Sequence, residues 1–219
     1  MKKRAVFIQG LSFLILMLVL LQPLSAQKKV LGLLNYDTSV PFGNTKDFSV
    51  SQISWLGISG QLRYFLNPKL SAGLYFGLQV FHGDTAKTAS IDLKDEFSGA
   101  ITGNQARYIN TIPIMLGVHF YAGKDPGTQA YIGLNAGVFG VLERVDIALF
   151  SVDQFVWHFG LAPEIGVILP LGYNFSLTAV VRYNHAFNAG QPLAGQSPAQ
   201  SYLSMSIGLG YTHYFFSLF

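Results

Sequence analysis

S-Y-L-S-M-S-I-G-L-G-Y-T-H-Y-F-F, residues 201 to 216, is the stretch from which the fold can be inferred. One alternate set of positions, from Leu203 to Phe215, is almost wholly apolar, whereas the other, from Ser204 to Thr212, holds only Ser, Gly and Thr. Successive side chains of a strand point to opposite faces. The solvent face of a soluble sheet would carry charge, and this face carries none. The pattern therefore predicts a strand with lipid on one side and an enclosed polar lumen on the other.

The composition agrees with a protein that has little water-exposed surface. Of the 219 residues, 50% are hydrophobic and 11% are charged, whereas globular domains have about 25% charged residues. The absence of cysteine excludes a disulfide scaffold and a thiolate metal site. Lys2, Lys3 and Arg4 account for the net charge of +3, so 14 − 3 = 11 basic residues face 11 acidic ones in the rest of the chain. The charge therefore gives no evidence for a nucleic-acid partner.

The first residues have the pattern of an export signal. Met1 to Arg4 is a positive segment, residues 11–21 are apolar, and Leu24-Ser25-Ala26 ends in a small residue suited to cleavage before Gln27. An uncleaved anchor helix is the alternative, but Pro23 and the short apolar core argue against it. We therefore predict a cleaved signal peptide at 1–26 and a single domain at 27–219. No later apolar run approaches the roughly 18 residues of a spanning helix, so the domain can enter a membrane only as strands.

Alternation of apolar with small or polar residues recurs along the whole domain. The predicted strands are Val30–Val40, Ile53–Leu66, Leu70–Phe81, Arg107–Tyr121, Gln129–Leu142, Phe155–Leu169, Phe175–Phe187 and Ser201–Phe216. Short turns follow the second, fourth and sixth strands, whereas longer segments, predicted as loops, occupy 42–52, 82–106, 143–153 and 188–200. Short turns at one end and long loops at the other are typical of outer-membrane barrels. The sequence predicts an all-β protein, an eight-stranded antiparallel up-and-down transmembrane β-barrel.

Aromatic residues near the ends of these strands have the distribution of an interfacial girdle. They are Tyr64, Tyr108, Tyr121, Trp157, Tyr183 and Tyr211. The charged residues follow the same division, because the longest predicted loop, 82–106, is rich in Asp, Glu and Lys. Charge is therefore expected where the chain meets water.

The interior of an eight-stranded barrel is just wide enough for side chains to fill. Asp37, Arg63, Glu164 and Arg182 are on the inward positions, and buried charges need partners. We predict that these four residues form an ion-pair network that plugs the lumen, with Glu164 and Arg182 as diagonal neighbours beside the turn at 170–174.

Two other uses of the lumen stay open. One is a narrow selective channel, and the other is a conduit for hydrophobic molecules that would contact Tyr75, Met115 and Phe139. His82, His119, His158 and His213 are too scattered for metal-ligand spacing, so we expect neither a metal nor another cofactor.

Two segments and the aromatic C-terminus carry a family resemblance. They are N-Y-D-T-S-V-P-F-G-N-T-K-D-F at 35–48 and G-Q-L-R-Y-F-L-N-P-K-L-S-A-G at 60–73. The chain resembles the small outer-membrane β-barrel proteins of the OmpA/OmpW-like class, and more narrowly the exported barrels of Bacteroidetes-type bacteria. The resemblance implies a location in the outer membrane, surrounded by its lipid. It also implies that the last strand, with Tyr211, Phe215 and Phe219, is the signal read by the barrel-assembly machinery.

A lipid-modifying enzyme is the second alternative function. N-H-A-F-N-A-G at 184–190 is faintly similar to the His-x-Ser-Asn segment of lipid A deacylases, but Phe187 stands where the nucleophilic serine would be. We expect His185 to lie at the outer rim on the lipid-facing side, and we predict no enzymatic activity. The predicted function is structural, or the binding of an extracellular ligand by the outer loops.

Overall fold

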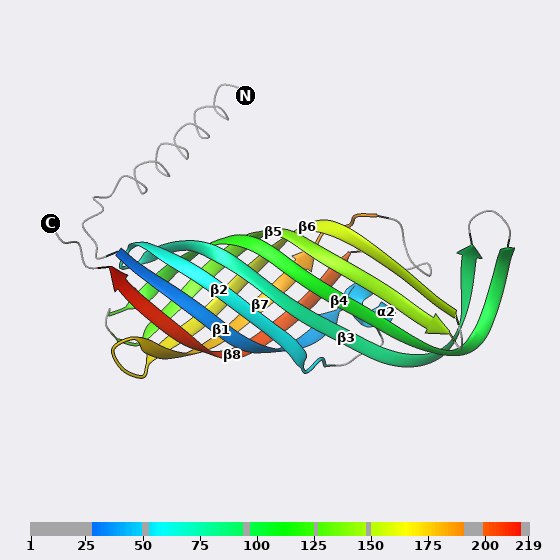
Figure 1. The fold of residues 1–219 in the computed structure, drawn as a ribbon, viewed down its shortest axis with the longest axis horizontal. Coiled ribbons are helices and arrows are strands. Elements are labelled where there is room, and N and C mark those ends of the chain that lie inside the picture. The colour runs from blue at the N-terminus through cyan, green and yellow to red at the C-terminus, as the bar shows by residue number, and fades with distance from the viewer. Residues whose placement is uncertain are drawn as a thin grey trace, which may run out of the picture.

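The computed structural model describes residues 28–49, 53–93, 97–124, 127–147, 150–190 and 199–215. Eight strands and one short helix occupy them (Figure 1). The elements are β1 Lys28–Phe42, α2 Gly43–Ser49, β2 Leu56–Asn67, β3 Leu70–Leu93, β4 Phe97–Gly123, β5 Gln129–Ile147, β6 Phe150–Pro170, β7 Phe175–Ala186 and β8 Gln200–Phe215. The predicted signal peptide at 1–26 lies outside the described residues, as does Phe219.

The strands form a closed barrel in chain order, and every neighbouring pair is antiparallel. Closure comes from β8, which pairs with β1 along its whole length, from Lys28 opposite Phe215 to Phe42 opposite Ser201. The predicted eight-stranded antiparallel barrel is confirmed. A closed barrel satisfies its backbone hydrogen bonds between strands, which is what a lipid environment requires.

Burial alternates along the strands as the sequence predicts, with the apolar side chains outside. Leu116 on β4 is 69% exposed and Ile207 on β8 is 66% exposed, while their neighbours in sequence point into the barrel. An exposed apolar surface of this extent marks a membrane or protein contact. One aromatic residue departs from the predicted girdle, because Tyr121 is 5% exposed and lies inside the barrel.

The two ends of the barrel differ. Short turns connect β2 to β3, β4 to β5 and β6 to β7 at what we call the turn end. At the opposite end, called here the hairpin end, β3 pairs with β4 as far as Leu93 opposite Phe97, and β5 pairs with β6 as far as Ile147 opposite Phe150. The prediction of loops at 82–106 and 143–153 is therefore wrong. Strand pairing continues in these segments although they extend beyond the apolar belt. Because their faces do not contact lipid, pairing there does not require the alternation of apolar residues that marks the other strand segments.

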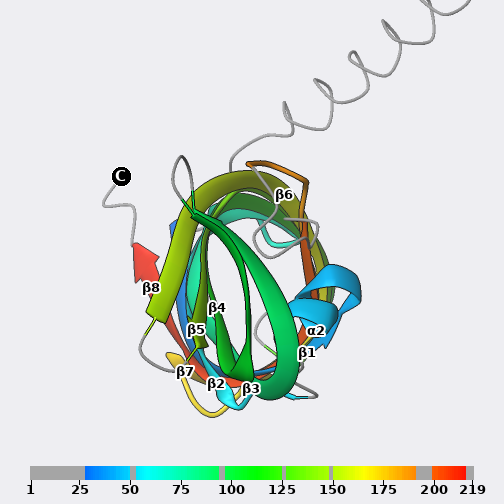
Figure 2. The ribbon, with the colours of Figure 1, turned by 90° about the vertical axis from the view of Figure 1, so that its right-hand side faces the viewer.

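The segment predicted as a loop at 42–52 contains α2, which lies at the rim of the hairpin end (Figure 2). Gly43 begins the helix with a φ of +50°, a conformation that glycine adopts without strain. Phe48 is 1% exposed, because the helix directs this ring into the core of the barrel. Among the described residues, no helix has the length and the apolar character needed to cross a membrane.

Prolines interrupt the barrel locally without changing its register. Pro113 lies in β4 and pairs with Phe139 of β5, but the pairing between β3 and β4 is interrupted between Phe76 and Gln79. Pro163 of β6 has the same effect on the pairing with β7. Proline lacks the N–H that a ladder needs, so each proline breaks pairing on one side while the other side holds the strand.

Gly73 of β3 shows how closely the strands of this barrel approach each other. A Cβ atom at this position would press against the carbonyl oxygen of Leu62, and a backbone atom cannot move aside cheaply. We expect Gly73→Ala to lower the free energy of unfolding by about 1 to 3 kcal/mol, the usual cost of overpacking. Urea titration in lipid vesicles measures this. Gly32→Ala is the matched control, since its nearest new contact would be 3.9 Å away; an equal loss in both variants would contradict the steric explanation.

Candidate functional site

A buried carboxylate at the centre of the lumen organises the polar interior. Glu164 of β6 accepts a hydrogen bond of 2.6 Å from Nη2 of Arg63 on its Oε1 and one of 2.7 Å from Nε of Arg182 on its Oε2. All three side chains are fully buried. Glu164 lies directly opposite Arg182 in the pairing of β6 with β7, rather than diagonal to it. One carboxylate thus bridges two guanidinium groups from β2 and β7.

The remaining contacts of this carboxylate come from β2, β4 and β5. Asn135 donates its Nδ2 to Oε2 at 3.1 Å, and Gln61 donates its Nε2 to the same oxygen at 3.5 Å. His119 Nε2 lies 3.1 Å from Oε1 without the alignment of a hydrogen bond. A buried charge needs such additional donors, because desolvation otherwise exceeds the attraction within the pair.

Arg63 is held by neutral partners as well as by Glu164. Its Nη1 donates to the hydroxyl of Tyr121 at 3.0 Å, its Nη2 to the hydroxyl of Tyr131 at 2.9 Å, and its Nε to Gln61 Oε1 at 2.7 Å. The guanidinium also lies 4.2 Å from the centre of the Tyr131 ring. The two tyrosines explain why Tyr121 points inward, since its hydroxyl satisfies a buried cation.

Asp37 is the member of the predicted network that the structure does not bring into an ion pair. It is 3% exposed, and its Oδ1 makes no hydrogen bond with the described residues. Arg182 instead lies over the ring of Tyr75, with 3.9 Å between Cζ and the ring centre. Of the four predicted residues, Arg63, Glu164 and Arg182 are therefore in direct contact, and Asp37 lies on the same inner wall beside Ser206 of β8.

Two apolar clusters lie on either side of this polar centre. Towards the turn end lie Leu31, Leu33, Phe65, Tyr121, Tyr131, Ile168 and Val180, and we call this set the lower cluster. Towards the hairpin end lie Phe48, Tyr75, Phe81, Ile109, Met115, Phe139, Val141, Val145, Ile147, Ala162, Ala186 and Tyr202, the upper cluster. The paired charges of the lumen therefore lie between two sets of packed apolar side chains, and buried polar residues such as Thr111, which donates to the hydroxyl of Tyr202, are interspersed in the upper set.

Charged residues outside the barrel mark where the apolar belt ends on β5. Leu142 is the last outward apolar residue, and Arg144 and Asp146 follow it on the same face. Arg144 donates its Nε to Asp146 at 2.8 Å. This hydrogen bond lowers the pKa of the Asp146 carboxyl and raises the pKa of Arg144. Because charged side chains are exposed at these positions, we infer that the residues of β5 beyond Leu142 lie outside the lipid.

A polar cluster at that level ties α2 to the barrel wall. Thr45 of α2 donates its hydroxyl to Gln200 Oε1 at 2.7 Å and accepts the backbone N–H of Ser201 at 2.8 Å. Gln200 in turn donates its Nε2 to Glu143 Oε1 at 2.6 Å. Burial raises the pKa of the Glu143 carboxyl to about 7, and the hydrogen bond from Gln200 offsets part of this rise. Thr45, Gln200 and Glu143 form what we call the helix clamp.

His185 lies on the outward face of β7, as predicted. It has a hydroxyl partner that the sequence reasoning missed, because its Nδ1 lies 2.8 Å from Oγ of Ser201 across the pairing of β7 with β8. A nucleophile–base pair also needs an orienting group and an oxyanion site. Among the described residues no carboxylate contacts His185, and the N–H of Ser201 is bound to Thr45. Within the described part of the chain, this pair therefore has neither an orienting carboxylate nor a free backbone N–H at Ser201.

The other predicted site residues have simple placements. Tyr211 is 45% exposed on the outward face of β8 and packs edge to face against Phe175. The side chain of Phe215 and the whole of Phe219 lie outside the described residues, so their role in assembly stays a prediction. Within the described ranges, no three His, Cys, Asp or Glu side chains are placed to hold a metal ion.

These features define the fold class as an eight-stranded antiparallel transmembrane β-barrel of the outer-membrane type. No protein-family model matches the sequence, and no curated protein matches it significantly. Among solved structures, the chain is similar to Ail, the attachment invasion locus protein of Yersinia pestis, in complex with the heparin analogue sucrose octasulfate. The identity is 12%, the TM-score is 0.54, and the match covers 86% of this chain and all (100%) of Ail.

Two further barrels match with lower scores. Neisserial surface protein A is 14% identical over 87% of this chain and 98% of its own, with a TM-score of 0.46. AlkL, an outer membrane protein solved in lipid bilayers, is 13% identical over 90% of this chain and 98% of its own, with a TM-score of 0.44. At these identities the likeness lies in the fold.

Proposed function

We propose that this protein is an integral outer-membrane barrel with a closed lumen, and that its role is structural or lies in surface binding at the hairpin end. The single observation that carries the closed lumen is the position of Glu164, Arg63 and Arg182 between two apolar clusters. An ion that crossed this barrel would have to separate both packed apolar layers and displace a charge pair. The energy required opposes conduction.

The conduit alternative receives less support than the plug. Tyr75, Met115 and Phe139 would be its lumenal contacts, and each is 3% exposed or less within the upper cluster. The ring of Tyr75 also lies against Arg182. These side chains are packed in the lumen, so a hydrophobic molecule that followed this path would have to displace them.

Charge supports a particular kind of surface partner. The described residues of the hairpin-end segments include four basic residues, Lys46, Lys87, Arg107 and Arg144, and six acidic ones, Asp47, Asp84, Asp92, Glu143, Asp146 and Asp153, which gives 4 − 6 = −2. Ail is described in complex with a heparin analogue, but a net negative end repels such a polyanion. For this chain we favour a cationic or neutral partner.

Orientation and assembly complete the proposal. Long hairpins outside and short turns in the periplasm are usual for outer-membrane barrels, and this supports an orientation with the hairpin end outside the cell. Export by the segment at 1–26 and insertion by the barrel-assembly machinery through Tyr211, Phe215 and Phe219 belong to the same proposal. The outward apolar belt is its contact with lipid.

Conductance measurement tests the closed lumen. Protein that migrates with the heat-modifiable shift of a folded barrel is reconstituted into planar bilayers, and we expect no stepwise conductance because both apolar clusters stay packed. A large porin in the same bilayers provides the positive control. Discrete current steps that appear only with the folded protein would refute the plug and favour the channel alternative.

A further inference from the structure

Two polar side chains lie within the outward apolar surface of β7 and β8. His185 of β7 and Ser201 of β8 are directly opposite each other in the strand pairing, and both are half-buried. His185 Nδ1 lies 2.8 Å from Ser201 Oγ. The proposed function uses neither side chain. A polar pair on a lipid-facing surface is costly unless its hydrogen-bonding groups have partners, so the partners of this pair need an explanation.

The pair lies close to the level where the apolar belt ends. Gln200, the neighbour of Ser201, donates its Nε2 to Glu143 at 2.6 Å inside the barrel. Glu143 directly follows Leu142, the last outward apolar residue of β5. Ser201 is therefore at about the level of Leu142. The polar interfacial region of a bilayer begins at this depth, so the pair can reach both acyl chains and the oxygen atoms that link them to a headgroup.

The pair has one hydrogen-bond donor more than its own contact uses. A neutral imidazole has one N–H and a serine side chain has one O–H. The contact between them uses one of these donors, whichever side chain donates, and leaves the other. The bond from Ser201 to Thr45 comes from the backbone N–H, and the two side chains make no further hydrogen bond with the described residues. One donor is therefore available to an external acceptor.

Apolar rings surround this donor. The ring of Phe187 packs edge to face against His185 at 4.9 Å and stacks with Phe159 of β6 at 6.1 Å. Phe159 is 58% exposed, Phe187 is 42% exposed and Tyr183 is 41% exposed. Leu161 lies opposite His185 in the pairing of β6 with β7. None of these side chains is charged, so the surface beside the donor suits an acyl chain and disfavours an ionic group.

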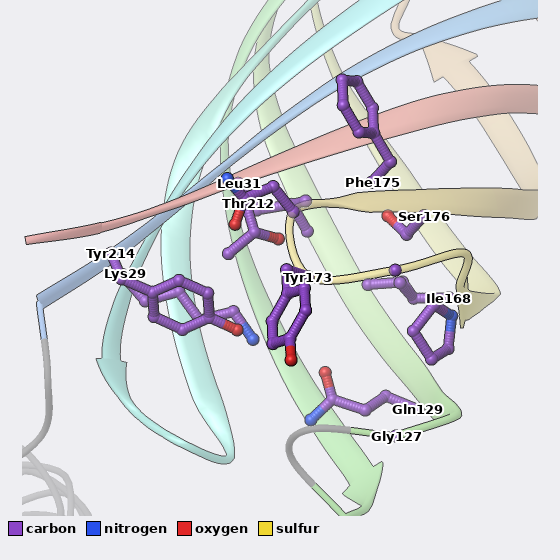
Figure 3. Close-up of a pocket in the computed structure, with 13 residues that line it drawn as sticks. Lys29, Leu31, Gly127, Gln129, Ile168, Tyr173, Phe175, Ser176, Thr212 and Tyr214 are labelled. Atoms are coloured by element: carbon purple, nitrogen blue, oxygen red, sulfur yellow. The ribbon is translucent and has the colours of Figure 1, made fainter.

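A lipid would have to bind on this outer surface, because the pocket at the turn end is too small for an acyl chain. That pocket lies at the opposite end of the barrel, and Lys29, Gln129 and Thr212 are among the residues that line it (Figure 3). Its volume of about 40 Å³ compares with about 10 to 15 Å³ for each water position. Water molecules fit there, whereas a chain of many carbon atoms does not.

We propose that His185 and Ser201 form a binding site for one membrane lipid in the leaflet at the hairpin end. The pair donates a hydrogen bond to the carbonyl oxygen of an acyl linkage, and the chain beyond that carbonyl lies against Phe159, Phe187 and Leu161. The ligand group is an uncharged acceptor because the donor is uncharged and has apolar surroundings. The site depends neither on the closed lumen nor on which end of the barrel faces outside.

Fluorescence quenching in dodecyl maltoside tests the site, since this detergent has no carbonyl group. The chain has two tryptophans, and Trp55→Phe leaves Trp157, which is 51% exposed two positions from Phe159 on β6. The probes are phosphatidylcholine with dibrominated acyl chains and its diether analogue, which lacks the carbonyls. We expect saturable quenching, with the ester lipid bound about two- to tenfold more tightly, as one hydrogen bond would give.

The variant that tests the pair replaces both residues, because either one alone keeps a donor. His185→Phe combined with Ser201→Ala is expected to lower the affinity for the ester lipid to that for the ether lipid. His82→Phe combined with Thr38→Val is the matched control, because it also removes one outward imidazole and one outward hydroxyl. The Thr38 hydroxyl already donates to the carbonyl of Met205 at 3.2 Å, so the control should keep the preference for the ester lipid.

Several results would overturn the proposal. They are equal affinities for the two lipids in the parent protein, a preference for the ester lipid that survives in the variant of His185 and Ser201, and an equal loss of preference in the control. If the variant does not assemble, the comparison of the two lipids with the parent decides alone. Trp157→Phe moves the reporter to Trp55, beside Tyr36 of β1. An equal preference there would show general partitioning and would also contradict the site.

Discussion

Replacing Glu164 by glutamine is expected to lower the free energy of unfolding by about 3 to 5 kcal/mol, the usual cost of removing one partner from a buried ion pair. The glutamine side chain nearly preserves the shape but removes the carboxylate that contacts the guanidinium groups of Arg63 and Arg182, all of which are fully buried. Urea titration of the folded barrel in lipid vesicles, followed by the heat-modifiable gel shift, measures the change.

The matched control is Asp37→Asn. Asp37 is as well buried as Glu164 but forms no ion pair among the described residues. We expect its replacement to cost clearly less than that of Glu164. Equal losses of unfolding free energy in the two variants would mean that Asp37 stabilises Arg182 by electrostatic attraction without contact. The direct ion pair with Glu164 would then not be the main contribution.

A triple replacement tests whether the ion pairs of Glu164 with Arg63 and Arg182 stabilise the barrel or only avoid the cost of leaving a buried charge unpaired. Arg63→Met, Glu164→Leu and Arg182→Met together remove all three charges while keeping most of the volume. Replacing a buried ion pair by apolar side chains is often neutral or stabilising, so we expect the triple variant to be more stable than Glu164→Gln alone. A triple variant that fails to fold would show that the hydrogen bonds to Tyr121, Tyr131 and Asn135 are needed for assembly.

The helix clamp is expected to loosen as the pH rises from about 4.5 to about 7. The Glu143 carboxyl has a pKa of about 7 when α2 is closed and 4.5 when it is exposed. Between these values the closed state keeps a proton that the open state releases, so increasing pH favours opening. Below 4.5 and above 7 the two states titrate alike and the equilibrium is flat. The total change is on the order of a hundredfold in the open population.

Hydrogen exchange of the α2 amides, corrected for the intrinsic pH dependence, measures this opening. Glu143→Gln should abolish the dependence, because it keeps an acceptor for Gln200 but cannot ionise. Asp146→Asn is the control, since Asp146 lies on the outward face in a pair with Arg144. Arg107 is the inward-facing cation of β4 at this end of the barrel. It donates hydrogen bonds to the Gln105 side chain and to the backbone carbonyl of Phe48. An unchanged pH profile in Glu143→Gln would contradict the assignment.

The membrane-spanning region of the fold could be predicted because lipid constrains both faces of every strand. Residues such as Leu116 must point outward, residues such as Gly117 inward, and this pairing recurs along all eight strands. Outside the lipid this constraint ends. The extensions of β3 and β4 beyond His82 therefore have no apolar alternation. From the sequence, these paired strands could not be distinguished from a loop.

The site was predictable as a set of inward charges but not as a set of contacts. The alternation places Glu164 and Arg182 on one face, whereas their directly opposed positions depend on the number of residues in the turn at 170–174. The position of α2 depends on Phe48 and Thr45 reaching partners more than 50 residues away, Arg107 and Gln200. A helix of seven residues is not stable in isolation. The local sequence therefore contains no pattern from which α2 could have been predicted.

If the hairpin end faces the outside, as proposed above, the length of the β3–β4 hairpin determines how far from the bilayer a partner can contact this protein. β3 continues for 12 residues beyond Phe81, and at about 3.3 Å per residue this corresponds to a contour length of roughly 40 Å. In Figure 1 the arm curves away from the body of the barrel. In the proposed orientation, an antibody, a receptor or a phage could bind the arm without approaching the bilayer, so a dense sugar layer around the barrel would not prevent recognition.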